Sequence, residues 1–178
     1  IIAKIYIKDS IKRNIDKTIN FFYDQGIDIK VISGDSVETV KNISKEVGIR
    51  NIKALDFTKI KSDDDIKKYL EDYNVYCRVS PFQKKEIIKQ LKEIGKNVCM
   101  VGDGVNDVLA LKESNFSISF KDGAEAARNI SNLVLLDDNF NVVPYVLMEG
   151  RKCINNIQRS ASLFLCKTIY ASLLAILF

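Results

Sequence analysis

Two aspartates and an asparagine lie close together in the segment Gly102-Asp103-Gly104-Val105-Asn106-Asp107. An apolar stretch over 97–101 comes before them, and a helical pattern over 107–113 follows. If the apolar stretch is a parallel strand, Asp103 lies at its carboxyl end, where open α/β sheets bind their ligands. Mg²⁺ prefers such oxygen donors and binds through one or two carboxylates plus substrate phosphate oxygens. The loop therefore predicts a magnesium site at Asp103 and Asp107; a tight turn with Asp107 as a helix cap is the simpler alternative.

Two further segments at predicted strand ends carry groups that suit a phosphoryl ligand. Ser33-Gly34-Asp35 offers a hydroxyl and a glycine N–H, although a serine beside an aspartate is also a common helix cap. Arg78-Val79-Ser80-Pro81 closes another strand, and Lys84 lies in the first turn of the helix that Pro81 begins. A lysine there can neutralise phosphoryl charge, but a single such lysine is usually a solvated surface residue. Each segment alone is a weak indication, whereas their order at three strand ends is specific.

The elements that must position these groups alternate between strand and helix patterns, as a parallel sheet covered on both faces requires. Residues 49–62 form a polar stretch without a predicted element, and the acidic run Asp63–Asp65 opens the helix after it. The fold class is therefore α/β with a doubly wound parallel sheet. The predicted strands cover 2–7, 27–32, 75–79, 97–101, 116–119 and 133–136, and the predicted helices cover 15–24, 37–47, 66–72, 83–94, 107–113 and 123–130.

The last part of the chain has a different character. The pattern is helical from Asn139 onward, and Ser160–Phe178 is mostly apolar. A membrane span needs about 20 apolar residues, and a surface helix would carry a polar face. We therefore predict a domain over 1–144, followed over 145–178 by a stalk and the start of a transmembrane helix. An amphipathic helix packed on the domain, or a dimer face, is the alternative.

The composition of the chain argues against some classes of function. The chain has 178 residues, 47% of them hydrophobic and 28% charged, which is ordinary for one globular domain with its own core. Its net charge of +4 comes from scattered lysines rather than a dense basic block, so we expect no nucleic-acid partner. The four cysteines are not closely paired and there is no histidine, so we expect buried, reduced thiols rather than a zinc site. Because the chain starts at Ile1 without a signal peptide, we expect it to be a piece of a longer protein.

In its motifs the sequence resembles the P-type cation-transporting ATPases, whose phosphorylation domain is of the haloacid dehalogenase type. The resemblance covers essentially the whole chain. Gly102–Lys112 is similar to the family's hinge motif, with Val108 where alanine is usual. Ser33-Gly34-Asp35 is similar to its Thr-Gly-Asp, and the segment from Arg78 to Lys84 to its Arg-x-x-Pro…Lys. Three further stretches are similar to the family's passage into its fifth transmembrane helix: 135–140, Glu149-Gly150-Arg151 and Asn155-Asn156.

The resemblance implies an ATP-driven pump that works through an aspartyl-phosphate, with Mg²⁺ and ATP as cofactors and a transported cation of unspecified identity. Asp103 would hold Mg²⁺ and Asp107 would support the metal site, while Lys84 and the Ser33 hydroxyl would bind phosphoryl oxygens. The remaining phosphoryl and nucleotide contacts would come from Gly34, Asp35, Arg78 and Asn106. The intact protein would be a multi-pass protein of the cell membrane, with residues 1–144 on the cytoplasmic side.

One departure from the family bears on activity. The phosphorylated aspartate of these ATPases lies in an Asp-Lys-Thr-Gly-Thr motif, which this sequence does not contain. In the family that motif precedes an inserted nucleotide-binding domain, so we expect the chain to be the part after the insertion and to be inactive alone. Two alternatives stay open, namely a soluble phosphatase of the haloacid dehalogenase type and a non-catalytic regulator with the same fold.

Overall fold

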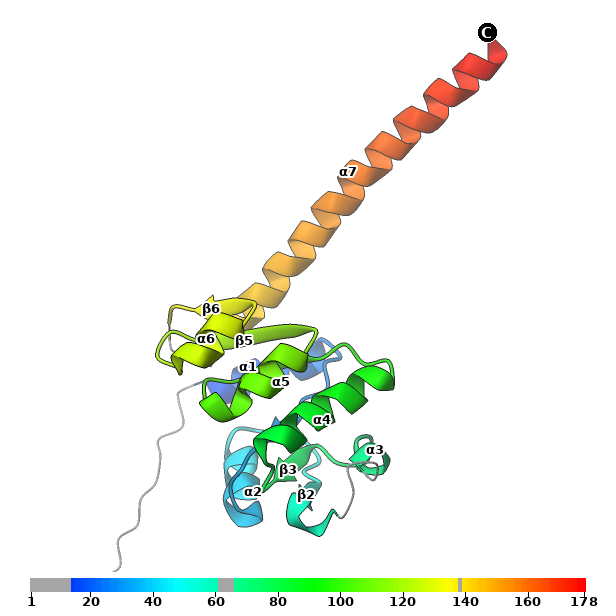
Figure 1. Cartoon of the computed structure of the whole chain (residues 1–178). Helices are drawn as coiled ribbons and strands as arrows, with labels where there is room; N and C mark the ends of the chain where they lie inside the picture. The colour runs from blue at the N-terminus through cyan, green and yellow to red at the C-terminus, as the bar shows by residue number, and fades with distance from the viewer. Residues whose placement is uncertain (1–13, 61–65, 138) are drawn as a thin grey trace, which may run out of the picture. The chain divides into compact units, whose positions relative to one another are not determined.

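The computed structural model of the protein describes residues 14–60, 66–137 and 139–178 (Figure 1). The strand predicted over 2–7 and the acidic run Asp63–Asp65 lie outside these residues. The chain divides into two compact units, Ile1–Asn141 and Val142–Phe178.

The described residues of the first unit form two three-stranded sheets, and every described strand pair is parallel. In one sheet, β3 (Val75–Cys77) lies between β1 (Val31–Ile32) and β2 (Ala54–Asp56). In the other, β5 (Phe116–Phe120) lies between β4 (Cys99–Val101) and β6 (Leu133–Leu135). This arrangement confirms the predicted α/β class with parallel strands.

Helices alternate with these strands along the chain (Figure 1). Three of them end in the same way, because a glycine with positive φ follows two residues after the last helical residue: Gly26, Gly48 and Gly95. Glycine adopts this left-handed backbone without steric cost, which stops a helix cleanly. The helices are α1 (Ile15–Asp24), α2 (Val37–Glu46), α3 (Ile66–Tyr69), α4 (Pro81–Glu93), α5 (Val108–Glu113) and α6 (Glu125–Ile130).

Helix α4 packs against both sheets. Its residue Ile87 is fully buried in a cluster with Tyr76 of β3, whereas the neighbouring Ile88 packs with Met100 of β4. Ile32 of β1 contacts both clusters. The helix therefore fixes the strand ends of one sheet relative to those of the other.

Several predicted boundaries are wrong. The strand predicted over 27–32 is only Val31–Ile32, because only these two residues pair with β3, at Val75 and Tyr76. Just before it, the Lys30 ammonium donates hydrogen bonds to the carbonyl oxygens of Leu70 and Tyr73, at 2.5 and 2.9 Å. Burial lowers the pKa of Lys30. Strand β3 ends at Cys77, and α3 covers only Ile66–Tyr69. The sequence pattern indicates no element over 49–62, but this stretch contains β2.

The predicted burial of the cysteines holds for one of the four. Cys77 is buried in β3, whereas Cys99, Cys153 and Cys166 are exposed. Cys99 opens the short strand β4, and the other two lie on the exposed helix of the second unit. All four are free thiols.

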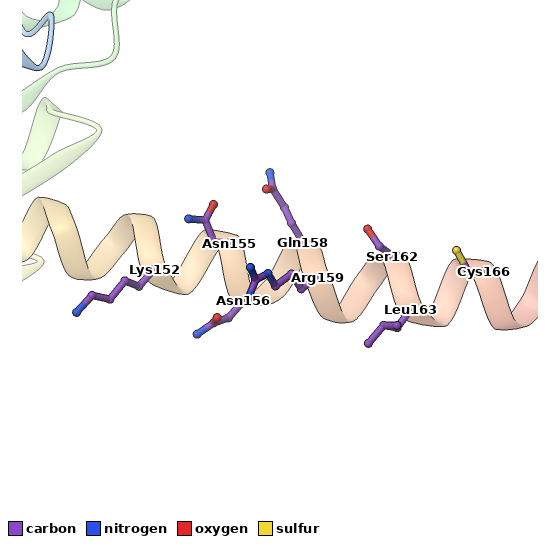
Figure 2. A pocket seen from close by; sticks show the side chains of 8 residues that line it. All are labelled: Lys152, Asn155, Asn156, Gln158, Arg159, Ser162, Leu163 and Cys166. Carbon is purple, nitrogen blue, oxygen red and sulfur yellow. The ribbon is translucent and has the colours of Figure 1, made fainter.

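The second unit is a single helix, α7 (Val143–Leu177), of 35 residues. The helical segment Phe140–Leu177 contains an 18-residue window with a mean hydropathy of 1.7, none of which is buried. Thirty-five residues at about 1.5 Å each exceed the roughly 30 Å of a bilayer core. Length and composition therefore allow α7 to cross a membrane. Figure 2 shows a shallow hollow on this helix whose eight lining side chains all belong to α7, so the hollow is not an enclosed binding cavity.

The position of α4 in the core yields a prediction. Truncation of the fully buried Ile87 to alanine should lower the free energy of unfolding by about 2–5 kcal/mol, because it leaves a cavity between helix and sheet. Ile43 on α2 is the matched control, since its side chain is 45% exposed, and Ile43→Ala should change stability by about 0.5 kcal/mol or less. Urea unfolding measures both. Equal losses would contradict the central place of α4.

Candidate phosphoryl- and magnesium-binding site

A buried ion pair joins two of the predicted site segments. The Lys84 ammonium on α4 donates to Asp107 Oδ1 at 2.7 Å, across the loop that follows β4. The two side chains are only 11% and 14% exposed. Charges withdrawn from water to this extent are stable only when paired. The structure thus brings together the lysine and the aspartate that the sequence placed 23 residues apart.

The start of α4 holds Lys84 in place. The Ser80 hydroxyl accepts a hydrogen bond from the Gln83 backbone N–H, and the Gln83 side chain accepts one from the Ser80 N–H. This reciprocal cap satisfies two N–H groups that the first helical turn leaves free. Pro81 is at the first helical position, where its missing N–H costs nothing. The helix therefore begins at a defined residue, and Lys84 points from its first turn.

Two glycines allow Asp107 to reach Lys84. A Cβ atom on Gly102 would lie 2.8 Å from the Asp107 Cβ, closer than van der Waals contact allows. A Cβ atom on Gly104 would lie 3.3 Å from Asp107 Oδ2, the oxygen that accepts a hydrogen bond from the Gly104 N–H. Both Asp107 oxygens are thus engaged, one by Lys84 and one by the loop backbone. The glycines of the motif are required because Asp107 folds back over the loop.

Asp103, unlike Asp107, has a free carboxylate. Asp103 is exposed, and its carboxylate accepts no hydrogen bond within the described part of the chain. Its backbone carbonyl oxygen accepts one from the Ala124 N–H at 2.7 Å. Asn106 is exposed on the same loop. A fixed backbone with an exposed carboxylate suits a Mg²⁺ ligand, since Mg²⁺ binds through one or two carboxylates plus phosphate oxygens. Residues 14–60, 66–137 and 139–178 contain no cluster of three or more acidic or thiol side chains able to hold a metal alone.

The Ser33-Gly34-Asp35 loop is tied to the end of β3. The Arg78 N–H donates to the Asp35 carbonyl oxygen and the Val79 N–H donates to the Ser33 carbonyl oxygen, each at 3.0 Å. The Ser33 hydroxyl donates to Asp35 Oδ2 at 3.0 Å. This second group of predicted residues is therefore assembled through the backbone. It connects to the Lys84 group through Ser80 and Pro81, which lead directly from Val79 into α4.

Arg78 has a strained backbone. Its φ of 54° lies in the left-handed region, which costs a non-glycine residue about 1–2 kcal/mol. This turn directly follows the end of β3 at Cys77, and the Arg78 residue is exposed. Hydrogen bonds from Thr58 lower the pKa of Asp56, at the end of β2, and the positive charge of Arg78 lowers it further. The sequence pattern does not predict Asp56 as a neighbour of the site, because it does not predict β2 itself.

The comparisons with known proteins identify the family of the chain. Residues 1–115 match the haloacid dehalogenase-like hydrolase family. The chain belongs to this family. A solved structure of the catalytic domain of a CPx-ATPase, CopB-B, superposes on this haloacid dehalogenase-like chain with a TM-score of 0.60 and 26% identity, covering 76% of this chain and 45% of the other.

Curated relatives point to cation-transporting ATPases. The chain is 42% identical, over 99% of its length, to the probable cation-transporting ATPase exp7 of Streptococcus pneumoniae. It is 38% identical, over 98% of its length, to the calcium-transporting ATPase CtpE of Mycolicibacterium smegmatis. The chain spans only 23% and 22% of those two proteins. These relatives confirm the predicted resemblance to the P-type cation-transporting ATPases.

The buried ion pair can be tested with a double-mutant cycle. Lys84→Met or Asp107→Asn alone should lower the free energy of unfolding by about 3–5 kcal/mol, because each leaves the partner charged and unpaired. The double variant should lose clearly less than the sum, with a coupling energy of about 1 kcal/mol or more. The control pair is Lys89 and Glu93 on the same helix, 3.9 Å apart with side chains 49% and 51% exposed. Lys89→Met with Glu93→Gln should show a coupling below about 0.5 kcal/mol. Additive losses at Lys84 and Asp107 would contradict the pairing.

Proposed function

We propose that the chain is part of an ATP-driven cation pump that passes through an aspartyl-phosphate, and that it supplies the Mg²⁺- and phosphoryl-binding loops. The observation that carries this proposal is the ion pair of Lys84 with Asp107, which lies on the same loop as the exposed Asp103. The similarity to cation-transporting ATPases over nearly the whole chain supports the pump rather than a soluble phosphatase or a regulator.

The side chains divide the work of phosphoryl transfer, which is mainly positioning and neutralisation of charge. Lys84, oriented by Asp107, places a positive charge where phosphoryl oxygens would bind. The Asn106 amide would donate a hydrogen bond to the same oxygens, and so would the Ser33 hydroxyl, in place of its present bond to Asp35 Oδ2. Asp103 would hold the Mg²⁺, and Asp107 would support the metal site by fixing the loop. Bound Mg²⁺ would neutralise charge on the transferred group.

We propose that Gly34, Asp35 and Arg78 face the nucleotide. Gly34 is exposed, and a Cβ there would meet only Val79 O at 3.7 Å among the described residues, so a ligand can approach its backbone closely. The exposed guanidinium of Arg78 is a permanent cation that suits a polyphosphate or a ribose oxygen. ATP and a cation of unspecified identity are therefore the proposed ligands of the whole protein.

The nucleophile must come from elsewhere in the whole protein. The sequence lacks Asp-Lys-Thr-Gly, and the chain spans less than a quarter of the relatives that it matches. We propose that the chain alone forms no phosphoenzyme. We also propose that residues 1–144 form the cytoplasmic domain and that 145–178 are the stalk and the start of a transmembrane helix in the cell membrane. The exposed, apolar α7 supports this division.

The Mg²⁺ assignment is tested in the full-length protein by phosphorylation with γ-labelled ATP. Asp103→Ala should abolish the acid-stable phosphoenzyme, because it removes a metal ligand worth several kcal/mol of charge neutralisation. Val108→Ala is the control, since Val108 packs against the buried cluster that contains Ile88, Met100 and Leu111 and is proposed to hold neither Mg²⁺ nor a phosphoryl oxygen. It should phosphorylate at about the wild-type level. Normal labelling of the Asp103 variant would overturn the proposed function.

The membrane assignment is tested by truncation after Arg159. The first unit buries its own core, whereas the residues removed lie on the exposed, apolar part of α7. The shortened chain should keep one cooperative thermal transition and become more soluble, because a large exposed apolar surface favours membranes or aggregation. Loss of the transition would show that the tail belongs to the globular core.

A further inference from the structure

We infer that the turn Lys121–Ala124 positions Asp103, and that Gly123 thereby sets the Mg²⁺ affinity of the site. The inference rests on the proposed function, and it adds a residue that neither the sequence motifs nor the family resemblance assigned. Its basis is a set of close contacts between this turn and the backbone and Cβ of Asp103.

Gly123 leaves no room for a side chain. A Cβ atom at this position would lie 3.0 Å from the Asp103 carbonyl oxygen, 3.1 Å from the Asp103 Cβ and 3.1 Å from the Phe120 carbonyl oxygen. Two of these three neighbours are backbone atoms, which cannot swing aside as the end of a flexible side chain can. A Cβ atom added to Gly26, Gly95 or Gly150, in contrast, would meet none of the described residues within 4 Å. Glycine is thus required at 123 by the close approach of Asp103.

The turn also holds Asp103 by a hydrogen bond. The Ala124 N–H donates to the Asp103 carbonyl oxygen at 2.7 Å, and on the other side the Gly102 N–H donates to the Ile118 carbonyl oxygen of β5 at 3.1 Å. The peptide after Asp103 is therefore held through its carbonyl oxygen, and the Val101–Gly102 peptide before it is held through its N–H, while the residue itself stays exposed.

The turn itself is rigidly anchored. The Gly123 N–H donates to the Phe120 carbonyl oxygen at 3.0 Å, and the Lys121 N–H donates to the Leu135 carbonyl oxygen of β6 at 2.9 Å. Directly after the turn, α6 begins and packs its fully buried Ala127 against Met100 and Leu111. The turn is thus held by a hydrogen bond to β6 and by a helix that packs into the core. Because the turn is fixed in this way, it fixes the position of Asp103. A ligand held by such a support binds its metal without a further cost of ordering.

The test uses Gly123→Ala in the full-length protein. The added methyl group must displace Asp103, so the Mg²⁺ concentration that half-saturates phosphoenzyme formation should rise about tenfold, as for other residues that support metal ligands. The ATP concentration for half-saturation and the maximal level at high Mg²⁺ should stay as in the wild type. Gly150→Ala is the matched control, since its added methyl group meets no atom of the described residues, and it should leave the Mg²⁺ dependence unchanged.

A second readout does not depend on activity. Hydrogen exchange measured by mass spectrometry without Mg²⁺ or nucleotide should show faster exchange at 121–127 in Gly123→Ala than in the wild type, because the Ala124 N–H loses its acceptor. Ala124→Pro removes this donor at a φ of −55° that suits proline, and its ring carbon, which replaces the amide hydrogen, also pushes the Asp103 carbonyl oxygen away. It should therefore raise the Mg²⁺ requirement in the same direction.

The outcomes separate the two proposals. An unchanged Mg²⁺ dependence in both Gly123→Ala and Ala124→Pro overturns the positioning role. A lower maximal level with an unchanged Mg²⁺ requirement also overturns it, because that result indicates only a damaged fold. A normal phosphoenzyme in Asp103→Ala contradicts the proposed function instead, whatever the turn variants do.

Discussion

The ion pair between Lys84 and Asp107 is the interaction on which the candidate site depends. Both charges are largely removed from water, so each side chain must find the other at hydrogen-bond distance, which here is 2.7 Å. This requirement fixes the start of α4 and the folded-back loop after β4 together. It also accounts for Gly102, where any side chain would collide with Asp107. A paired, preoriented lysine can meet phosphoryl charge without reorganising, and this is the property that phosphoryl transfer needs most.

Helix α4 links this local ion pair to the packing of both sheets. The reciprocal cap of Ser80 and Gln83 sets where the helix begins, and Ile87 and Ile88 bury adjacent positions against different sheets. The loops after β1, β3 and β4 therefore meet around one helix. Because all described strands are parallel, their carboxyl ends lie at the same edges of their sheets, where ligands bind in open α/β folds.

The site combines tightly held and exposed groups. Asp107 is fully engaged, and the Ser33-Gly34-Asp35 loop is held by the backbone of Arg78 and Val79. Asp103, Asn106 and Arg78 are exposed. The strained backbone of Arg78 is tolerated because its N–H is bonded to Asp35 and its neighbour Val79 is buried. Strain of this kind persists where surrounding contacts over-determine it, and it is common at functional sites. In the proposed function, these exposed groups would meet a charged ligand, while the tightly held groups would keep the loops in place.

The sequence by itself determined the features that depend on local backbone chemistry. Gly26, Gly48 and Gly95 ended their helices, Ser80 and Pro81 began α4, and the Gly-Asp-Gly run placed a loop at a strand end. These signals act within a few residues, so they can be recognised without the fold. The tertiary structure decided what depends on distant partners. From the sequence, Lys84 has the features of an ordinary surface lysine, and only the fold pairs it with Asp107 in a buried position. The three-residue strand β2 forms by pairing with β3. Glycine is required at position 123 only because Asp103 lies against it. Such contacts join residues about twenty or more positions apart, and no local preference encodes them.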